Sequence, residues 1–134
     1  MLTLLTASSE GAWCFADSLG QAGRDWTAAW FSERMKKEGP RGEVSLFGEV
    51  PVFDPVRYEA DNRERWTLTI ASNIDKMLTG MGSFKPADHV PEVYGAVLGQ
   101  AWERHARAAV KRLHPAKVDH DGIGDFWKAT LSRP

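Results

Sequence analysis

The strongest pattern of apolar and polar positions lies between residues 90 and 113. At 100° per residue, one broad helical face collects Val90, Val93, Tyr94, Val97, Leu98, Ala101, Trp102, His105, Ala106, Ala109, Val110 and Leu113. A face this wide predicts a central helix at about 90–113 that other elements cover on more than one side. Asp88 is the expected N-cap, Pro91 suits the first turn, and Pro115 ends the helix because proline has no N–H to donate.

Two shorter helices are predicted in the first forty residues. Residues 8–19 would form the first helix, and Gly20 or Gly23 would stop it. Residues 26–37 would form the second helix, which ends before the Gly-Pro-Arg-Gly break at 39–42. The glycines are interpreted here as the turn between two helices.

Three stretches are predicted to be β-strands. Residues 2–4 would form a short one, and residues 43–53 a second one that glycine and proline interrupt. Residues 66–71 alternate large apolar side chains with small or polar ones, which is the pattern of a half-buried strand. The polar residues 54–65 would connect these strands through a turn.

Helical patterns return after the strands, as a short helix at 72–80 and a closing helix at 123–131. The order of helices, strands and helices predicts an α+β fold. In that fold a small antiparallel sheet of two to four strands packs against the helices. A chain of 134 residues fits a single domain, 1–134, with one core.

Composition and charge narrow the class of protein. Apolar residues make up 43% of the chain and charged residues 26%, as in ordinary globular proteins rather than disordered ones. The net charge of −1 gives the whole molecule no attraction to nucleic acid or membrane, so such binding would need a local patch. The sequence has no apolar run of the ~20 residues that span a bilayer, and no basic signal-peptide start. With Cys14 as the single cysteine, we expect a cytoplasmic protein without a membrane partner.

A loop rich in histidine and aspartate follows the central helix at 114–125. Its candidate metal ligands are His114, Asp119, His120 and Asp121. Clustered imidazoles and carboxylates bind divalent ions, so a metal-assisted hydrolase is one alternative hypothesis. The aspartate spacing begins like a calcium loop, but Ile123 and Thr130 stand where its fifth and twelfth ligands are expected. The simpler interpretation is that the aspartates cap the last helix and the histidines face water.

Other catalytic signals are weak. Cys14 would need a base and an orienting group, and is interpreted as a packing residue. His105 lies on the apolar face of the central helix, where a core histidine with one hydrogen bond to a backbone carbonyl is favoured over a base with a shifted pKa. The chain has no nucleophile elbow, phosphate loop or glycine-rich dinucleotide turn. No cofactor is expected, and a non-enzyme is favoured over an enzyme.

Nucleic-acid binding is a second alternative, with two candidate surfaces. Residues 12–34 have the spacing of a degenerate helix-turn-helix, although the second helix is too aromatic and too acidic for typical base reading. The other surface is a basic stripe of Arg104, Arg107 and Lys111, whose cations fit phosphate oxygens. The helix dipole also favours cations in the last turns, so a solvated face is the competing interpretation.

Six tryptophans are present, and two of them lie one turn apart on the second predicted helix. Trp26 and Trp30 share one face of that helix. A second apolar stripe, about 140–180° away by the helical period, consists of Ala28, Phe31 and Met35. A short surface helix usually buries one stripe, so burial of the second would expose the two tryptophans. The alternative is that both stripes are buried, because an exposed aromatic patch without a partner is costly.

The leading hypothesis is a non-catalytic interaction protein that binds a protein or nucleoprotein partner through an aromatic-basic surface. Exposed tryptophan beside arginine and lysine has the composition of a binding hot spot. The candidate binding residues are Trp26, Trp30, Arg34, Lys37, Arg104, Arg107 and Lys111. Sequence patterns leave the identity of the partner and the oligomeric state open.

Overall fold

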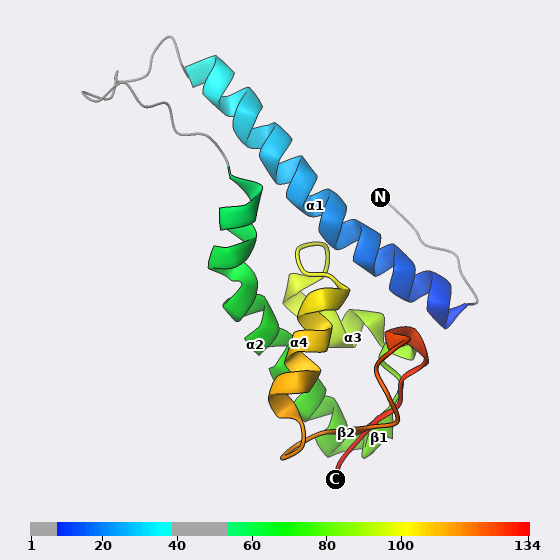
Figure 1. The fold of residues 1–134 in the computed structure, drawn as a ribbon. Coiled ribbons are helices and arrows are strands. Elements are labelled where there is room, and N and C mark those ends of the chain that lie inside the picture. The colour runs from blue at the N-terminus through cyan, green and yellow to red at the C-terminus, as the bar shows by residue number, and fades with distance from the viewer. Residues whose placement is uncertain (1–7, 39–53) are drawn as a thin grey trace.

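The computed structural model describes residues 8–38 and 54–134, without the side chains of residues 35–38. The described helices are α1 (Ser9–Glu38), α2 (Pro55–Met81), α3 (Val90–Tyr94) and α4 (Glu103–Leu113). Short 3-10 turns are η1 (Pro86–Asp88), η2 (Gly95–Val97) and η3 (Phe126–Lys128). The described strands are β1 (Ser83–Phe84), β2 (Asp119–His120) and β3 (Leu131–Ser132). In Figure 1, α1 is a long rod at one side, and α4 lies against α2.

The predicted α+β fold with a small antiparallel sheet is confirmed. The described strands follow the order β1-β3-β2, and both pairings are antiparallel. Phe84 and His120 both pair with Leu131, on its two sides. Phe84 and Leu131 are buried, so the sheet closes one end of the core. The strands predicted at 2–4 and 43–53 lie outside the described residues.

The core is built around α2. The Asp54 carboxylate accepts the backbone N–H groups of Val56 and Arg57, and Pro55 begins the helix where no N–H is needed. Buried residues then recur at helical spacing, namely Glu59, Trp66, Thr67, Ile70, Ala71, Ile74 and Leu78. This face packs against α3 and α4. The helix ends at Gly82, where a φ of 76° favours glycine.

The predicted strand at 66–71 and the predicted connection at 54–65 are wrong, because both segments are helical parts of α2. Trp66 and Ile70 are buried, but Leu68 is 46% exposed. Residues four apart lie on the same side of a helix and residues two apart do not. The alternation of apolar and polar residues at 66–71 is therefore part of a helical pattern. Trp66 and Ile70 lie on the face of α2 that is also buried in the turns before and after them.

The two predicted N-terminal helices are one continuous helix, so the predicted helix-turn-helix at 12–34 is also wrong. α1 passes through Gly20 and Gly23 without a break. A Cβ at Gly20 would lie 2.2 Å from the carbonyl oxygen of Ala101, and one at Gly23 would lie 2.1 Å from that of Gly99. The two glycines are therefore points of close approach to another backbone, and not stops.

The predicted central helix at 90–113 is divided. α3 and η2 precede a non-helical segment at 98–102, and α4 follows. Gly95 and Gly99 have φ values of 53° and 82°, which interrupt the helical conformation. The predicted burial of this stretch is confirmed for Val93, Tyr94, Val97, Ala101 and His105. Most of this apolar face is buried, but Leu98, which was expected on it, is 41% exposed.

Smaller expectations had mixed outcomes. Pro91 lies in the first turn of α3 as predicted, but the N-cap is His89 instead of Asp88. The helix predicted at 72–80 is the last part of α2. The predicted closing helix at 123–131 is only η3, followed by β3. No helix in the described ranges has the length and apolar character to cross a membrane.

Candidate functional site

The two parts of α1 lie in different surroundings, and we name them the docked half (Ser9–Gly23) and the projecting half (Arg24–Glu38). In the docked half, Trp13 is 1% exposed and Ala16 is also buried. Figure 1 shows the docked half beside α3 and η3, whereas the projecting half extends away from them. One helix therefore supplies both a core face and a surface.

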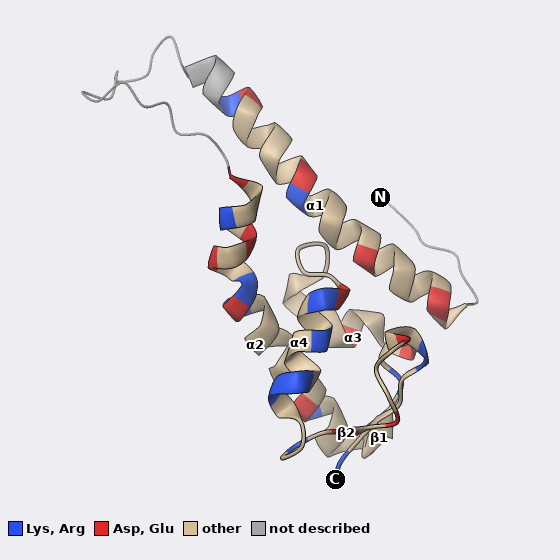
Figure 2. Ribbon diagram, viewed as in Figure 1, with Lys and Arg blue, Asp and Glu red and all other residues tan. Residues whose placement is uncertain are grey.

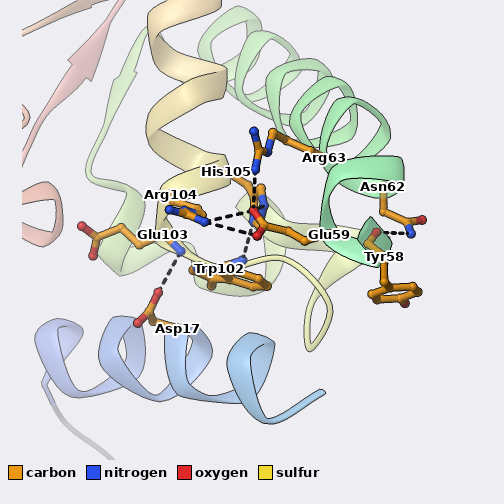
Figure 3. Close-up of polar contacts among 9 residues, drawn as sticks. All are labelled: Asp17, Tyr58, Glu59, Asn62, Arg63, Trp102, Glu103, Arg104 and His105. Carbon is orange, nitrogen blue, oxygen red and sulfur yellow. Dashed lines mark hydrogen bonds and ion pairs between the residues drawn. The ribbon is translucent and has the colours of Figure 1, made fainter. Parts of the chain in front are cut away.

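Two hydrogen bonds connect the docked half to the start of α4. The Asp17 carboxylate accepts the backbone N–H of Glu103 at 2.9 Å (Figure 3). The Trp13 indole donates its N–H to the Glu103 carboxylate at 2.8 Å. The first N–H groups of a helix have no partner within it, and its N-terminus favours negative charge. Asp17 thus caps α4 from another helix, which ties the docked half to the core.

The projecting half exposes two indoles. Trp26 is 73% exposed and Trp30 is 49% exposed. The guanidinium carbon of Arg34 lies 5.3 Å from the centre of the Trp30 ring, within range of a cation–π contact. Phe31 is partly buried, and the side chain of Lys37 is among those not described. Of the two expectations for these tryptophans, the structure shows the exposed one.

Trp30 and Arg34 continue the face of α1 that is buried in the docked half. At 100° per residue, Ala16, Gly23, Trp30 and Arg34 fall within about 40° of one another. Ala16 is buried and Gly23 approaches a backbone carbonyl, whereas Trp30 and Arg34 are exposed. The same face therefore changes from core to surface along the helix.

The predicted basic stripe is largely engaged in ion pairs. Arg104 donates to both carboxylate oxygens of Glu59, at 3.1 and 3.2 Å. Arg107 pairs with Glu103 at 2.6 Å. Lys111 is exposed and has no ion pair among the described side chains. Figure 2 shows acidic residues next to basic ones on α2 and α4. The stripe is thus a mixed surface and not a uniformly positive one.

A polar network lies between α2 and α4, centred on Glu59, which is 7% exposed (Figure 3). Besides Arg104, the carboxylate accepts from Arg63 at 3.3 Å. His105 Nε2 lies 3.3 Å from a Glu59 oxygen, without hydrogen-bond geometry. On the other side of the ring, Nδ1 accepts the backbone N–H of Trp102 at 3.1 Å. With Nδ1 as acceptor, a neutral ring carries its proton on Nε2, which faces the carboxylate.

Burial and the arginines set the pKa values in this network. Burial lowers the pKa of His105 below its ordinary value of 6.5, and Arg104 and Arg63 lower it further against the opposing effect of Glu59. Burial raises the pKa of Glu59, but Arg104 and Arg63 together outweigh this, and the pKa falls below 4.5. At neutral pH a neutral imidazole therefore faces an ionised carboxylate. The prediction that His105 is a core residue is confirmed, although its partner is a backbone N–H and not a carbonyl.

The loop at 114–125 brings two histidines together but uses many of its polar atoms internally. The rings of His114 and His120 have centres 5.0 Å apart. His120 Nδ1 accepts a backbone N–H at 3.2 Å, and Asp119 and Asp121 each accept one at 2.8 Å. These aspartates therefore stabilise the turn and the sheet instead of a last helix. In residues 8–38 and 54–134, no group of three or more His, Cys, Asp or Glu is placed to hold a metal ion.

An open hollow of about 450 Å³ lies between α2 and the end of α4. Its lining residues are Leu68, Ala71, Ser72, Asp75, Arg112, Leu113, Ala116 and Lys117. Lys117 pairs with Asp75 at 3.0 Å, and Arg112 pairs with Glu64 at 2.6 Å. The lining contains neither histidine nor cysteine, and its charged groups already pair with one another or with a neighbour.

Sequence reasoning missed the residues that join distant segments. Glu59 was expected in a polar loop, and its position seven residues before Trp66, on the same helical face, is the signal that could have found it. Asp17 and Glu103 are 86 residues apart in the chain, so no local pattern connects them. Cys14, interpreted as a packing residue, is exposed.

No family model, curated protein or solved structure matches this chain. No activity, substrate or partner is therefore carried over from a relative. The function is inferred from the residues and their geometry alone.

Proposed function

We propose that this chain is a non-catalytic interaction protein that binds a protein or nucleoprotein partner through an aromatic stripe on α1. The aromatic stripe consists of Trp26, Trp30 and Arg34, and Lys37 extends it by helical spacing. The observation that carries the proposal is the 73% and 49% exposure of the two indoles, in a helix whose other tryptophan, Trp13, is buried.

Two exposed indoles in the middle of a helix favour association. Covering a large apolar side chain contributes roughly 1.5–3 kcal/mol, and tryptophan and arginine are enriched among the residues that dominate binding energy. Arg34 lies over the ring of Trp30 within the same helix, so the stripe presents a cation next to an aromatic ring. The helical backbone is already ordered, and binding would have to restrict mainly side chains.

Nucleic-acid binding through Arg104, Arg107 and Lys111 stays a prediction, and the described contacts give it less support. Arg104 and Arg107 already engage Glu59 and Glu103, so phosphate groups would have to compete with carboxylates. Binding of this kind weakens steeply with salt. The metal-assisted hydrolase based on residues 114–125 likewise stays a prediction.

Capture from a cell extract by the immobilised full chain tests the proposed function. The wild-type chain should retain a set of proteins that the Trp26→Ala, Trp30→Ala double variant loses. Leu68→Ala is the matched control, because Leu68 is also exposed, at 46%, but lies on α2. Mass spectrometry identifies the retained proteins, and nuclease treatment distinguishes a protein partner from a nucleoprotein.

The double variant should keep the helical circular dichroism and the melting temperature of the wild type. Identical capture by all three chains would contradict the proposal. Loss of the fold in the double variant would also contradict it, because these indoles would then belong to the core.

A further inference from the structure

We infer that the partner of the aromatic stripe is a second copy of this chain, an inference that rests on the proposed function. The two projecting halves lie antiparallel, with a twofold axis beside Trp30. In this arrangement Trp30 contacts Trp30 of the partner subunit, and Arg34 contacts Trp26 of the partner subunit. Twofold dimers are the commonest symmetric assemblies of soluble proteins.

The order of residues along the stripe makes it complementary to its own reverse. Trp26, Trp30 and Arg34 are four residues apart, which is about 6 Å along a helix. Read backwards the stripe is Arg, Trp, Trp, so an antiparallel copy sets a guanidinium against an indole at both ends. An indole pair lies in the middle. Guanidinium and indole faces attract each other, as Arg34 and Trp30 already show at 5.3 Å.

A parallel arrangement is less favourable. It would set Arg34 against Arg34 of the partner subunit, and like charges in contact cost free energy. The antiparallel arrangement separates the two guanidiniums by about 12 Å, the rise of eight helical residues. The net charge of −1 on each copy causes only weak repulsion at long range. The order of the residues along the stripe therefore favours the antiparallel pair.

The shape of α1 leaves room for this pair. An axis at position 30 sets position 36 opposite position 24, six residues to either side, and position 24 begins the projecting half. The overlap is thus residues 24–36, about 18 Å of helix. α3, η1 and η3 of each copy lie beside the docked half (Figure 1), so the two bodies fall at opposite ends of the overlap. The partner covers the continuation of the face that is buried in the docked half.

The size of the stripe indicates a reversible dimer. A tryptophan buries roughly 150–250 Å² when fully covered, and Trp26 and Trp30 are 73% and 49% exposed. Together they supply roughly a third of the ~800 Å² that each partner buries in a standard interface. The dimer population should therefore rise with protein concentration.

Sedimentation velocity of the full chain over a concentration series tests the dimer. The wild-type mass should rise from 14.9 kDa towards twice that value, while the Trp26→Ala, Trp30→Ala double variant stays at the monomer mass. Leu68→Ala should dimerise like the wild type. A wild-type chain that is monomeric at every concentration overturns the inference, and so does a double variant that dimerises equally well.

Cysteine cross-linking tests the antiparallel arrangement. Positions 27 and 33 are equidistant from Trp30, so in an antiparallel pair 27 of one copy lies at the same height as 33 of the other, across the interface. Cys14 is exposed, so the experiment uses a Cys14→Ser background. With a short bismaleimide cross-linker that reaches across the interface, a mixture of Thr27→Cys and Glu33→Cys chains should give mainly the 27–33 heterodimer. Mainly 27–27 and 33–33 products would overturn the arrangement.

The inference and the proposed function can fail separately. If the chain is monomeric but still captures another protein through Trp26 and Trp30, the inference that the partner is a second copy is wrong. The proposed function is then still supported. If neither self-association nor capture depends on these two residues, both are overturned.

Discussion

The docked and projecting halves of α1 carry tryptophans in opposite surroundings. Trp13 in the docked half stacks on Phe126 with ring centres 5.1 Å apart and donates a hydrogen bond to Glu103. Trp26 and Trp30 in the projecting half face solvent. The helical period decides which side chains share a face. The elements that lie opposite that face decide whether it becomes core or a surface for a partner.

Alanine at Trp13 and at Trp26 should give the largest contrast between the halves. Trp13→Ala removes a buried indole and its bond to Glu103, and should lower the free energy of unfolding by about 3–5 kcal/mol. Trp26→Ala removes an exposed indole and should change it by less than about 0.5 kcal/mol. Denaturant titration measures both values. Losses of similar size would show that the projecting half is core as well, and the comparison would fail.

A smaller effect is expected where the docked half ends. Gly23→Ala would place a Cβ 2.1 Å from the carbonyl oxygen of Gly99, so α1 must shift away, at a cost of about 1–3 kcal/mol. Gly80→Ala on α2 is the control, because a Cβ there meets nothing within 4 Å. It should raise the stability by about 0.5–1 kcal/mol, since alanine loses less entropy in a helix. Thermal unfolding that moved upwards in both variants would contradict the close contact at Gly23.

Glycine shows why the boundaries of the elements could not be predicted from sequence alone. Gly20 and Gly23 were expected to stop a helix, yet they lie inside α1, where they admit a neighbouring backbone. Gly95 and Gly99 were expected inside a helix, yet their positive φ values end it. A glycine costs a helix only about 1 kcal/mol, so contacts from distant segments decide between these outcomes.

In the candidate site, too, some features depend on a local sequence pattern and others on contacts between distant segments. The two apolar stripes on one short segment, a local property of a helix, allowed either exposure or burial of Trp26 and Trp30, and the structure shows that both are exposed. The network of Glu59 and His105 joins α2 to α4 and could not be read from spacing, because the two residues are 46 positions apart. Burial of His105 was predictable from its apolar neighbours, whereas the identity of its partners was not.

Acid should weaken the anchorage of the docked half and leave the projecting half unchanged. His105 accepts the N–H of Trp102 at the start of α4, the helix that Asp17 of the docked half caps. Burial lowers the pKa of His105 in the folded chain, so below pH 6.5 the unfolded chain binds more protons. The stability that is present above pH 6.5 is then lost as the pH falls through the folded pKa. The lowered pKa of Glu59 acts in the same direction below pH 4.5.

Melting temperatures between pH 7 and pH 5 measure this effect, and His105→Asn isolates it. The asparagine oxygen can still accept the N–H of Trp102, but the side chain does not titrate, so the variant should lose less stability on acidification than the wild type. His114→Asn is the control, since His114 is exposed, and it should keep the wild-type slope. An unchanged slope in His105→Asn would show that acid acts elsewhere. Protonation of His105 would then not be the reason why acid weakens the docked half.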